Sequence, residues 1–295
     1  MLNNLHKIQK LISMMNNSNY YSNLFRNSGK AFFFLLLCIF LFFLPAGCKD
    51  SKNRPVNVIG STSIQPFAEL LAEEFQKIKP ADIIDVQGGG STAGIQAIAN
   101  GIADIGMCSR TLKEEEKAVD TAIEIARDGL AVVVHKSNPV SNLTLEQIRM
   151  LFSGQIQNWK ELGGNDIPVR LIMREEGSGT REAFIKLVMG KTIVSRKALV
   201  QESNGAVKEL VRLDPAAVGY MSLGLVGEDL KSLYVDGIEP SAKQVSSGKY
   251  RLSRPFLFVL KKNTQLRPEA QEFIDFVISD EGQKILESEG LVRVK

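Results

Sequence analysis

The sequence has little cysteine and little histidine. Its 295 residues include three cysteines (Cys38, Cys48 and Cys108) and two histidines (His6 and His135). Three cysteines cannot build a disulfide scaffold or a zinc site with four cysteine ligands, and two histidines argue against a histidine-rich metal centre. We therefore expect no metal and no cofactor, and interpret His135, which follows an apolar run, as a structural residue.

Several enzyme signatures are also missing. The sequence has no nucleotide-binding loop ending in Gly-Lys-Ser/Thr and no Gly-x-Ser-x-Gly elbow of a serine hydrolase. Its apolar fraction of 44% and charged fraction of 23% are ordinary, so the composition is that of a folded globular chain. These absences favour a binding protein over an enzyme.

An excess of one charge is absent from most of the chain. The formal net charge is +3, from 36 basic and 33 acidic residues. Residues 1–47 hold four of the basic residues and no acidic one, so 32 basic and 33 acidic residues remain after this segment. The remainder has a net charge of −1 and no basic block, which argues against nucleic acid as a partner.

A long apolar run occurs once, near the start. Residues 31–44 are 14 consecutive apolar residues, fewer than the ~20 of a membrane span and typical of a secretory signal peptide. The run leads to Ala46-Gly47-Cys48, which resembles a bacterial lipobox, although Pro45 stands where leucine is usual. We expect residues 1–47 to be a lipoprotein signal peptide and Cys48 to carry lipid. A plain signal peptide or an uncleaved anchor are the alternatives.

The segment before the apolar run is unusually long. Thirty residues precede it, whereas whole signal peptides have ~15–30 residues. We therefore expect translation to start at Met14 or Met15. Residues 48–54 are polar and are expected to form a tether.

The rest of the chain alternates apolar runs with amphipathic stretches, which predicts an α/β fold. Helical spacing of apolar residues is clear over residues 66–78. Thr144 with Gln147, and Thr111 with Glu114, are typical of capping boxes at helix starts, and Pro268 fits a first helical position. The expected strands are 56–59, 83–87, 103–107, 130–135, 168–173, 217–222 and 255–260.

A loop rich in glycine, serine and threonine recurs three times between an expected strand and an expected helix. Helix starts offer free N–H groups to anions, glycine permits close approach of the backbone, and hydroxyls add donors without charge. Three such loops could surround one tetrahedral oxyanion. The loops are Gly60-Ser61-Thr62-Ser63, Gly88-Gly89-Gly90-Ser91-Thr92-Ala93-Gly94 and Gly177-Ser178-Gly179-Thr180.

Arg174 distinguishes the third loop. It precedes Gly177 by three residues at the end of an expected strand. A guanidinium can hold two oxygens of an oxyanion, and a neighbouring carboxylate, for which we favour Glu176, could orient it.

Four ordered motifs resemble the phosphate-binding proteins of bacterial phosphate ABC importers, the PstS family, over about residues 55–290. They are Gly60–Ser63, Gln87–Gly94, Asp104–Arg110 and Arg174–Thr180. The resemblance implies a two-lobed periplasmic-binding-protein fold of type II, each lobe a mixed sheet flanked by helices. It implies one lobe of residues 55–138 plus 250–295, a second of 139–249, and hinges near Lys136–Asn142 and Ser246–Arg254.

Carried over by position, the resemblance also implies the residues of the site. Phosphate would be bound by Ser61, Thr62, Ser63, Ser91, Ser109, Arg110, Arg174, Ser178, Gly179 and Thr180, with Glu176, Gly90 and Thr92 in support.

One position departs from the better-known members of the family, which have an aspartate where this chain has Ser109. A carboxylate can accept the proton of hydrogen phosphate and repels sulfate, which has none. Ser109 could still accept through its lone pairs, and Arg110 could add positive charge.

We therefore expect a monomeric, lipid-anchored protein outside the cytoplasm, at the cell surface or in a periplasm. It would capture inorganic phosphate and deliver it to an ABC permease without catalysing a reaction. The alternatives are a receptor for sulfate, molybdate or phosphonate, a phosphate sensor or adhesin, and a phosphoester hydrolase with a loop serine as nucleophile.

Overall fold

The computed structural model describes residues 54–294. The expected signal peptide (1–47), the expected lipidation site Cys48 and most of the expected tether lie outside the described residues. Among the helices of residues 54–294, none combines the length and hydropathy that a membrane span requires.

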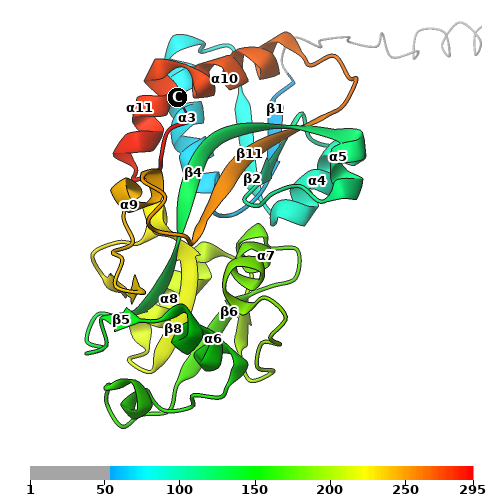
Figure 1. Cartoon of the computed structure of the whole chain (residues 1–295). Helices are drawn as coiled ribbons and strands as arrows, with labels where there is room; N and C mark the ends of the chain where they lie inside the picture. Colours follow the sequence, from blue (N-terminus) through cyan, green and yellow to red (C-terminus); the bar gives the residue numbers. More distant parts are fainter. Residues whose placement is uncertain (1–53, 295) are drawn as a thin grey trace, which may run out of the picture. The chain divides into compact units, whose positions relative to one another are not determined.

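A first group of strands forms a mixed sheet in the order β2-β1-β3-β11-β4 (Figure 1). The first three strands in the chain are parallel, and β11 runs antiparallel to both of its neighbours. The strands are β1 (Val56–Gly60), β2 (Ile84–Gly88), β3 (Ile105–Cys108), β4 (Asp120–His135) and β11 (Ser253–Lys261). Because β1 and β2 are parallel neighbours, the loops that follow them leave the same edge of the sheet.

Helices cover both faces of this sheet. On one face α3 (Gln65–Ile78), α10 (Pro268–Ile278) and α11 (Asp280–Ser288) pack around Phe75 and Phe258 in the larger core cluster. On the other face α4 (Ser91–Ala99) packs its Ile95 against Cys108 and Leu257. A short helix, α5 (Glu114–Val119), leads into β4.

The long strand β4 joins this sheet to a second group of strands. Residues 120–129 of β4 pair with β11, and residues 130–134 pair with β8 (Ala217–Ser222). The strand therefore runs through both groups as one continuous ribbon (Figure 1). Pairing changes partner at Gly129–Leu130, and the sequence-based lobe boundaries stay a prediction.

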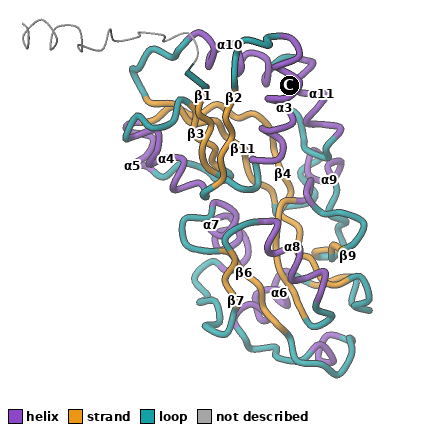
Figure 2. The backbone as a smooth tube through the Cα atoms, turned by 180° about the vertical axis from the view of Figure 1, so that it is seen from behind, coloured by secondary structure: helices purple, strands orange, loops and turns teal. Residues whose placement is uncertain are grey.

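The second group continues the order β4-β8-β6-β7, with β9 also paired to β4. One face is covered by α6 and α7, whose Phe152 and Phe184 pack on Tyr220, and the other by α8 (Figure 2). The strands are β6 (Arg170–Arg174), β7 (Leu199–Gln201) and β9 (Leu230–Ser232), with β5 (Asn142–Leu143) and β10 (Tyr234–Val235) as a separate pair. The helices are α6 (Leu145–Ser153), α7 (Gly179–Phe184) continued by η3 (Ile185–Met189), α8 (Asn204–Leu213) and α9 (Ala242–Ser246), with single turns η2 (Trp159–Leu162) and η4 (Leu223–Leu225).

The predicted α/β class, with mixed sheets flanked by helices, is confirmed, and each expected strand overlaps an observed one. The capping box of Thr144 and Gln147 is present, and α10 begins at Pro268. The box of Thr111 with Glu114 is wrong, because α5 begins later, with Glu116 accepting from the N–H of Lys113 at 2.7 Å. The charged N-terminal half of β4 gave no apolar run and was not predicted as strand.

Candidate anion-binding site

The three hydroxyl-glycine loops meet at one place in the structure. The loop after β2 bonds to the loop after β1, with the N–H of Gly90 donating to the carbonyl of Gly60 at 2.9 Å. It also bonds to the loop after β6, with the N–H of Thr92 donating to the carbonyl of Gly177 at 3.1 Å. The first two loops belong to the first group of strands and the third to the second. The meeting point therefore lies between the two groups.

The hydroxyls of these loops form a buried cluster. Ser63 and Thr180 bring their Oγ atoms within 2.7 Å, and Ser61 donates to Ser109 over 2.8 Å. Ser91 accepts from the N–H of Ser109 at 3.0 Å. Each buried member is 3% exposed or less: Ser61, Ser63, Ser91, Ser109, Ser178 and Thr180. Polar groups so deeply buried need hydrogen-bond partners, which makes this cluster a candidate site.

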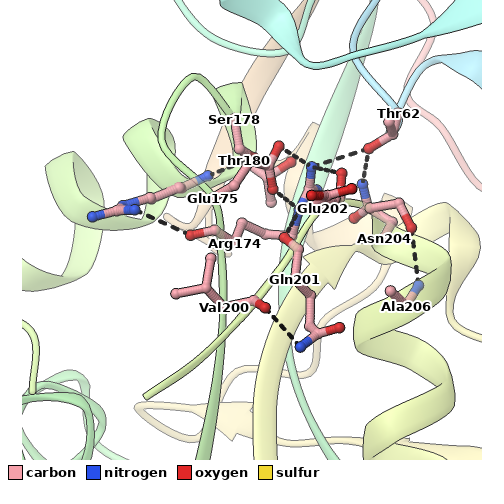
Figure 3. Close-up of polar contacts among 12 residues, drawn as sticks. Thr62, Arg174, Glu175, Ser178, Thr180, Val200, Gln201, Glu202, Asn204 and Ala206 are labelled. Carbon is pink, nitrogen blue, oxygen red and sulfur yellow. Dashed lines mark hydrogen bonds and ion pairs between the residues drawn. The ribbon is translucent and has the colours of Figure 1, made fainter. Parts of the chain in front are cut away.

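Arg174 ends β6 at this cluster and is 1% exposed. Figure 3 shows its guanidinium held by Glu175, with Nε and Nη2 donating to the two carboxylate oxygens at 2.9 Å each. Nη2 also donates to Oγ1 of Thr62 in the first loop at 3.1 Å. The remaining nitrogen, Nη1, is buried and has no hydrogen-bond partner among residues 54–294. A buried, charged donor without an acceptor is costly, so Nη1 is poised for an anion.

The start of α7 adds main-chain donors. The first N–H groups of a helix have no partner within it, and here they belong to Gly179 and Thr180. A side chain on Gly179 would place its Cβ 2.2 Å from Oγ of Ser91 and 2.7 Å from Oγ of Ser109. Glycine is therefore required for this helix start to approach the first group so closely.

Glu176 forms a different ion pair from the one expected. Glu176 was expected to hold Arg174, but it is 92% exposed and forms its ion pair with Arg181 at 3.8 Å. Glu175 takes that role because it follows β6 directly and its N–H is bonded to Gln201 on β7, which turns its carboxylate back toward Arg174.

Arg110 lies beside the hydroxyl cluster but is bonded elsewhere. Its Nη1 and Nη2 donate to Glu116 at 2.7 and 2.8 Å, and its Nε lies 3.0 Å from Glu182 on α7. Burial lowers the pKa of Arg110, but the two carboxylates outweigh burial and raise it above its ordinary value. All three of its nitrogens thus face carboxylates, whereas Arg174 is paired with Glu175 through Nε and Nη2 and keeps Nη1 open.

Arg254 and Asp128 were missed by sequence reasoning. They face each other across β11 and β4, and Arg254 donates from Nε and Nη2 to one oxygen of Asp128 at 3.1 and 3.0 Å. Arg254 is 2% exposed and also donates to Ser63 at 3.1 Å and to Ser109 at 3.4 Å. Burial raises the pKa of Asp128, and the guanidinium opposes that rise. The available signal was a charge of opposite sign just before each of two apolar runs, residues 130–134 and 255–260.

Asn204 and Ser222 of the second group were also missed. Asn204 begins α8 and donates from Nδ2 to Ser63 at 2.7 Å (Asn204 is also drawn in Figure 3). Ser222 ends β8 and donates its hydroxyl to Asp128 at 2.9 Å. These bonds connect the second group to the hydroxyls and the ion pair of the first. Within residues 54–294, no group of His, Cys, Asp or Glu side chains is arranged to hold a metal ion.

Comparison with known proteins identifies the family. The model of the PBP superfamily domain matches residues 49–281. The phosphate-binding protein PstS of Bacillus subtilis is 30% identical over 253 residues, 83% of this chain and 83% of that protein. The chain belongs to the PstS family. The PstS of Borreliella burgdorferi is also 30% identical, over 84% of this chain and 93% of its own length.

Solved structures agree with this PstS-family assignment. A phosphate ABC transporter substrate-binding protein from Clostridium perfringens, crystallised with bound phosphate, is 42% identical with a TM-score of 0.79. It is matched over 82% of this chain and 100% of its own. An ABC-type phosphate transport receptor from Vibrio cholerae is 38% identical, with a TM-score of 0.67, over 80% of this chain and 99% of its own. The periplasmic-binding-protein fold expected from the sequence is confirmed, and these relatives are binding proteins rather than enzymes.

Proposed function

We propose that this protein captures inorganic phosphate outside the cytoplasm and delivers it to an ABC importer. The observation that carries the proposal is Nη1 of Arg174, a buried cationic donor without a partner among the described residues, next to hydroxyls from three loops. The relatives named for phosphate binding and the Clostridium protein with bound phosphate support the choice of anion.

In this proposal, the anion binds between the two groups of strands, which act as lobes that close on it. Arg174 supplies the charge. Hydroxyls of both groups and the N–H groups of Gly179 and Thr180 supply the remaining donors. Arg110 acts indirectly, because all three of its nitrogens face Glu116 or Glu182, whereas Arg174 keeps Nη1 open. Opening of the lobes would limit release of the anion.

The proposal includes a membrane anchor and a location. Lipid on Cys48 would hold a monomer at the outer face of a membrane, beside a permease. Labelling with a fatty-acid analogue tests the anchor, since Cys48→Ser should lose the label and Cys108→Ser should keep it, because Cys108 is buried within β3. Labelling that persists in Cys48→Ser would overturn the anchor but leave phosphate capture in place.

Titration calorimetry with phosphate tests the site. Arg174→Met should raise the Kd for phosphate on the order of 100-fold or more, because charge-assisted hydrogen bonds contribute roughly 1.5–3 kcal/mol each. Arg170→Met is the matched control. It removes an arginine of the same strand that is 60% exposed and paired with Asp214, and it should leave the Kd nearly unchanged. Equal affinities in the two variants would place the site elsewhere.

The main alternative is another tetrahedral oxyanion. The absence of an aspartate at Ser109 favours this alternative, because a neutral hydroxyl does not repel sulfate. If titration calorimetry shows that sulfate binds more strongly than phosphate, sulfate would be the ligand instead. A sensor or adhesin role would instead leave binding intact without any dependence of phosphate uptake on this protein.

A further inference from the structure

The hydrogen bonds of the hydroxyl cluster have a direction, which starts at Ser63. A hydroxyl oxygen has two lone pairs and one proton. The lone pairs of Ser63 face two donors, Nδ2 of Asn204 at 2.7 Å and Nη2 of Arg254 at 3.1 Å. The proton of Ser63 must therefore go to the remaining neighbour, Oγ1 of Thr180 at 2.7 Å. Thr180 is then left with its own proton free to donate to a ligand.

The orientation of Asn204 is fixed by the main chain. The N–H of Ser222 donates to Oδ1 of Asn204 at 3.2 Å. A main-chain N–H can only donate, so the carbonyl end of the amide faces Ser222 and the NH₂ end faces Ser63. The same NH₂ group lies 3.4 Å from Oγ1 of Thr62, which also receives Nη2 of Arg174 at 3.1 Å. Both lone pairs of Thr62 are thus occupied, and its hydroxyl can only donate.

The hydroxyl of Ser109 also has both of its lone pairs occupied. It receives the proton of Ser61 at 2.8 Å and Nη1 of Arg254 at 3.4 Å. Its own proton points to Ser91, 3.4 Å away, which already accepts the N–H of Ser109. Ser91 is left with a free proton for a ligand. The lone pairs of Ser109, which the sequence offered as a substitute for the missing aspartate, are occupied.

The carboxylates bonded into this network also face donors. Asp128 gives one oxygen to Arg254 and the other to Ser222, and Glu175 gives both oxygens to Arg174. Glu175 accepts these bonds from Nε and Nη2 of Arg174, whereas the nitrogen left open for a ligand is Nη1, so both carboxylates are bonded to arginines of the network rather than turned to the ligand. The hydroxyl acceptors that remain are neutral and number three: single lone pairs on Thr180, Ser178 and Ser61. The other lone pair of Ser178 receives the N–H of Arg181 at 3.3 Å, and that of Ser61 receives the N–H of Ser63 at 3.2 Å.

We propose that Arg254 and Asn204 are positioning residues that commit the hydroxyls of the site to donate, so that it selects its anion by charge and shape with little reading of the ligand's proton. This inference rests on the proposed phosphate site. Hydrogen phosphate can donate its proton only to a neutral hydroxyl. Sulfate has no proton and loses that single hydrogen bond, but no carboxylate is turned toward it to repel it. One neutral hydrogen bond corresponds to a preference of about tenfold or less. The site therefore takes aprotic tetrahedral dianions such as sulfate within about tenfold of phosphate.

Calorimetric titration with inorganic phosphate and with sodium sulfate tests this, at a pH above the second pKa of phosphate so that the dianion prevails. Wild type should bind both, with a ratio of Kd values of about ten or less. Binding of phosphate with sulfate weaker by more than about 100-fold would overturn the inference and leave the proposed function standing. Binding of neither anion would sink the proposed function, and the inference with it.

Two variants test the positioning role. Asp128→Leu/Arg254→Met replaces the buried pair by apolar side chains of similar size, because removal of one partner alone would strand a buried charge. Asn204→Leu removes the second donor to Ser63 and leaves the ion pair intact. Each frees lone pairs that can accept the proton of phosphate and weakens the donors that sulfate needs. The preference for phosphate over sulfate should therefore rise by roughly three- to tenfold.

A merely structural role would weaken both anions equally. An unchanged ratio of the two Kd values in both variants would therefore contradict the proposal. If the double variant does not fold, Asn204→Leu decides alone, since it leaves the Asp128–Arg254 pair in place.

Discussion

At the scale of single residues, Gly179 is a point of close approach between the two groups of strands at the site. Its missing side chain leaves room for Oγ of Ser91 and Oγ of Ser109, which a Cβ would meet at 2.2 and 2.7 Å. Such distances force the backbone apart, because real Cβ contacts are longer. The start of α7 and the hydroxyls of the first group therefore depend on each other for their donor geometry.

Gly179→Ala should weaken phosphate binding by tenfold or more, because even a 1 Å displacement of positioned groups can cost about 100-fold. Gly205→Ala in α8 is the control. Its nearest neighbour would be 3.8 Å away, so it should keep phosphate affinity and stabilise the helix by up to about 1 kcal/mol. Equal phosphate affinity in both variants would contradict the close approach described here.

Some residues of the site could be predicted from the sequence, and others could not. The hydroxyl loops were visible because each combines glycine and hydroxyls between a strand and a helix. Arg254 was not, because its partner Asp128 lies 126 positions away and only the register of β4 against β11 makes them neighbours. For Glu175 and Glu176, adjacent carboxylates of equal chemistry, the bend of the chain after β6 decides which one holds Arg174.

At the scale of elements, α7 is tied to the first group by ion pairs as well as by the anion site. Glu182 on α7 lies 3.0 Å from Nε of Arg110 and 3.4 Å from Nζ of Lys113. Both partners belong to the segment between β3 and α5. These contacts exist only while the two groups are together, so they favour the arrangement that encloses the anion.

Glu182→Gln should raise the Kd for phosphate by roughly two- to fivefold, the size expected when partly exposed ion pairs are lost. The effect should shrink at high salt, because ions screen exposed charges. Glu176→Gln is the control, since it removes the same charge from the neighbouring loop where the carboxylate is 92% exposed. Titration of both variants at low and high salt checks this, and an equal rise in both would assign the effect to net charge rather than to the bridge.

The elements also show where sequence patterns succeed. Apolar runs such as those of β8 and β11 predicted strands nearly to the residue, because both faces of these strands are covered. The first half of β4 mixes charged and apolar residues, and apart from β11 it pairs, within residues 54–294, only through the bridge of Arg127 to Val292, so its pattern resembled a surface segment. The first half of β4, the strand that links the two groups, was therefore not predicted as a strand.

At the scale of the whole molecule, β4 makes the two groups of strands a single structural unit. Its first half belongs to the sheet with β11 and its second half to the sheet with β8. The ion pair of Asp128 and Arg254 lies at this junction, and Ser222 of β8 bonds to the same carboxylate. Because both sheets share β4, unfolding of either sheet should destabilise the other.

Residues 54–294, which form the two groups of strands, should accordingly unfold in one transition. Trp159, the single tryptophan of the chain, is 1% exposed within the second group and its fluorescence reports on that group. Far-ultraviolet circular dichroism reports on both groups. The two signals should give the same urea midpoint, as expected of a two-state transition. Phosphate at 100 times its Kd should raise the unfolding free energy by about 2.7 kcal/mol in both signals, because it binds only the folded protein. A fluorescence midpoint below that of dichroism, or a phosphate shift in one signal alone, would mean that the groups unfold separately and that β4 is only a connection between them.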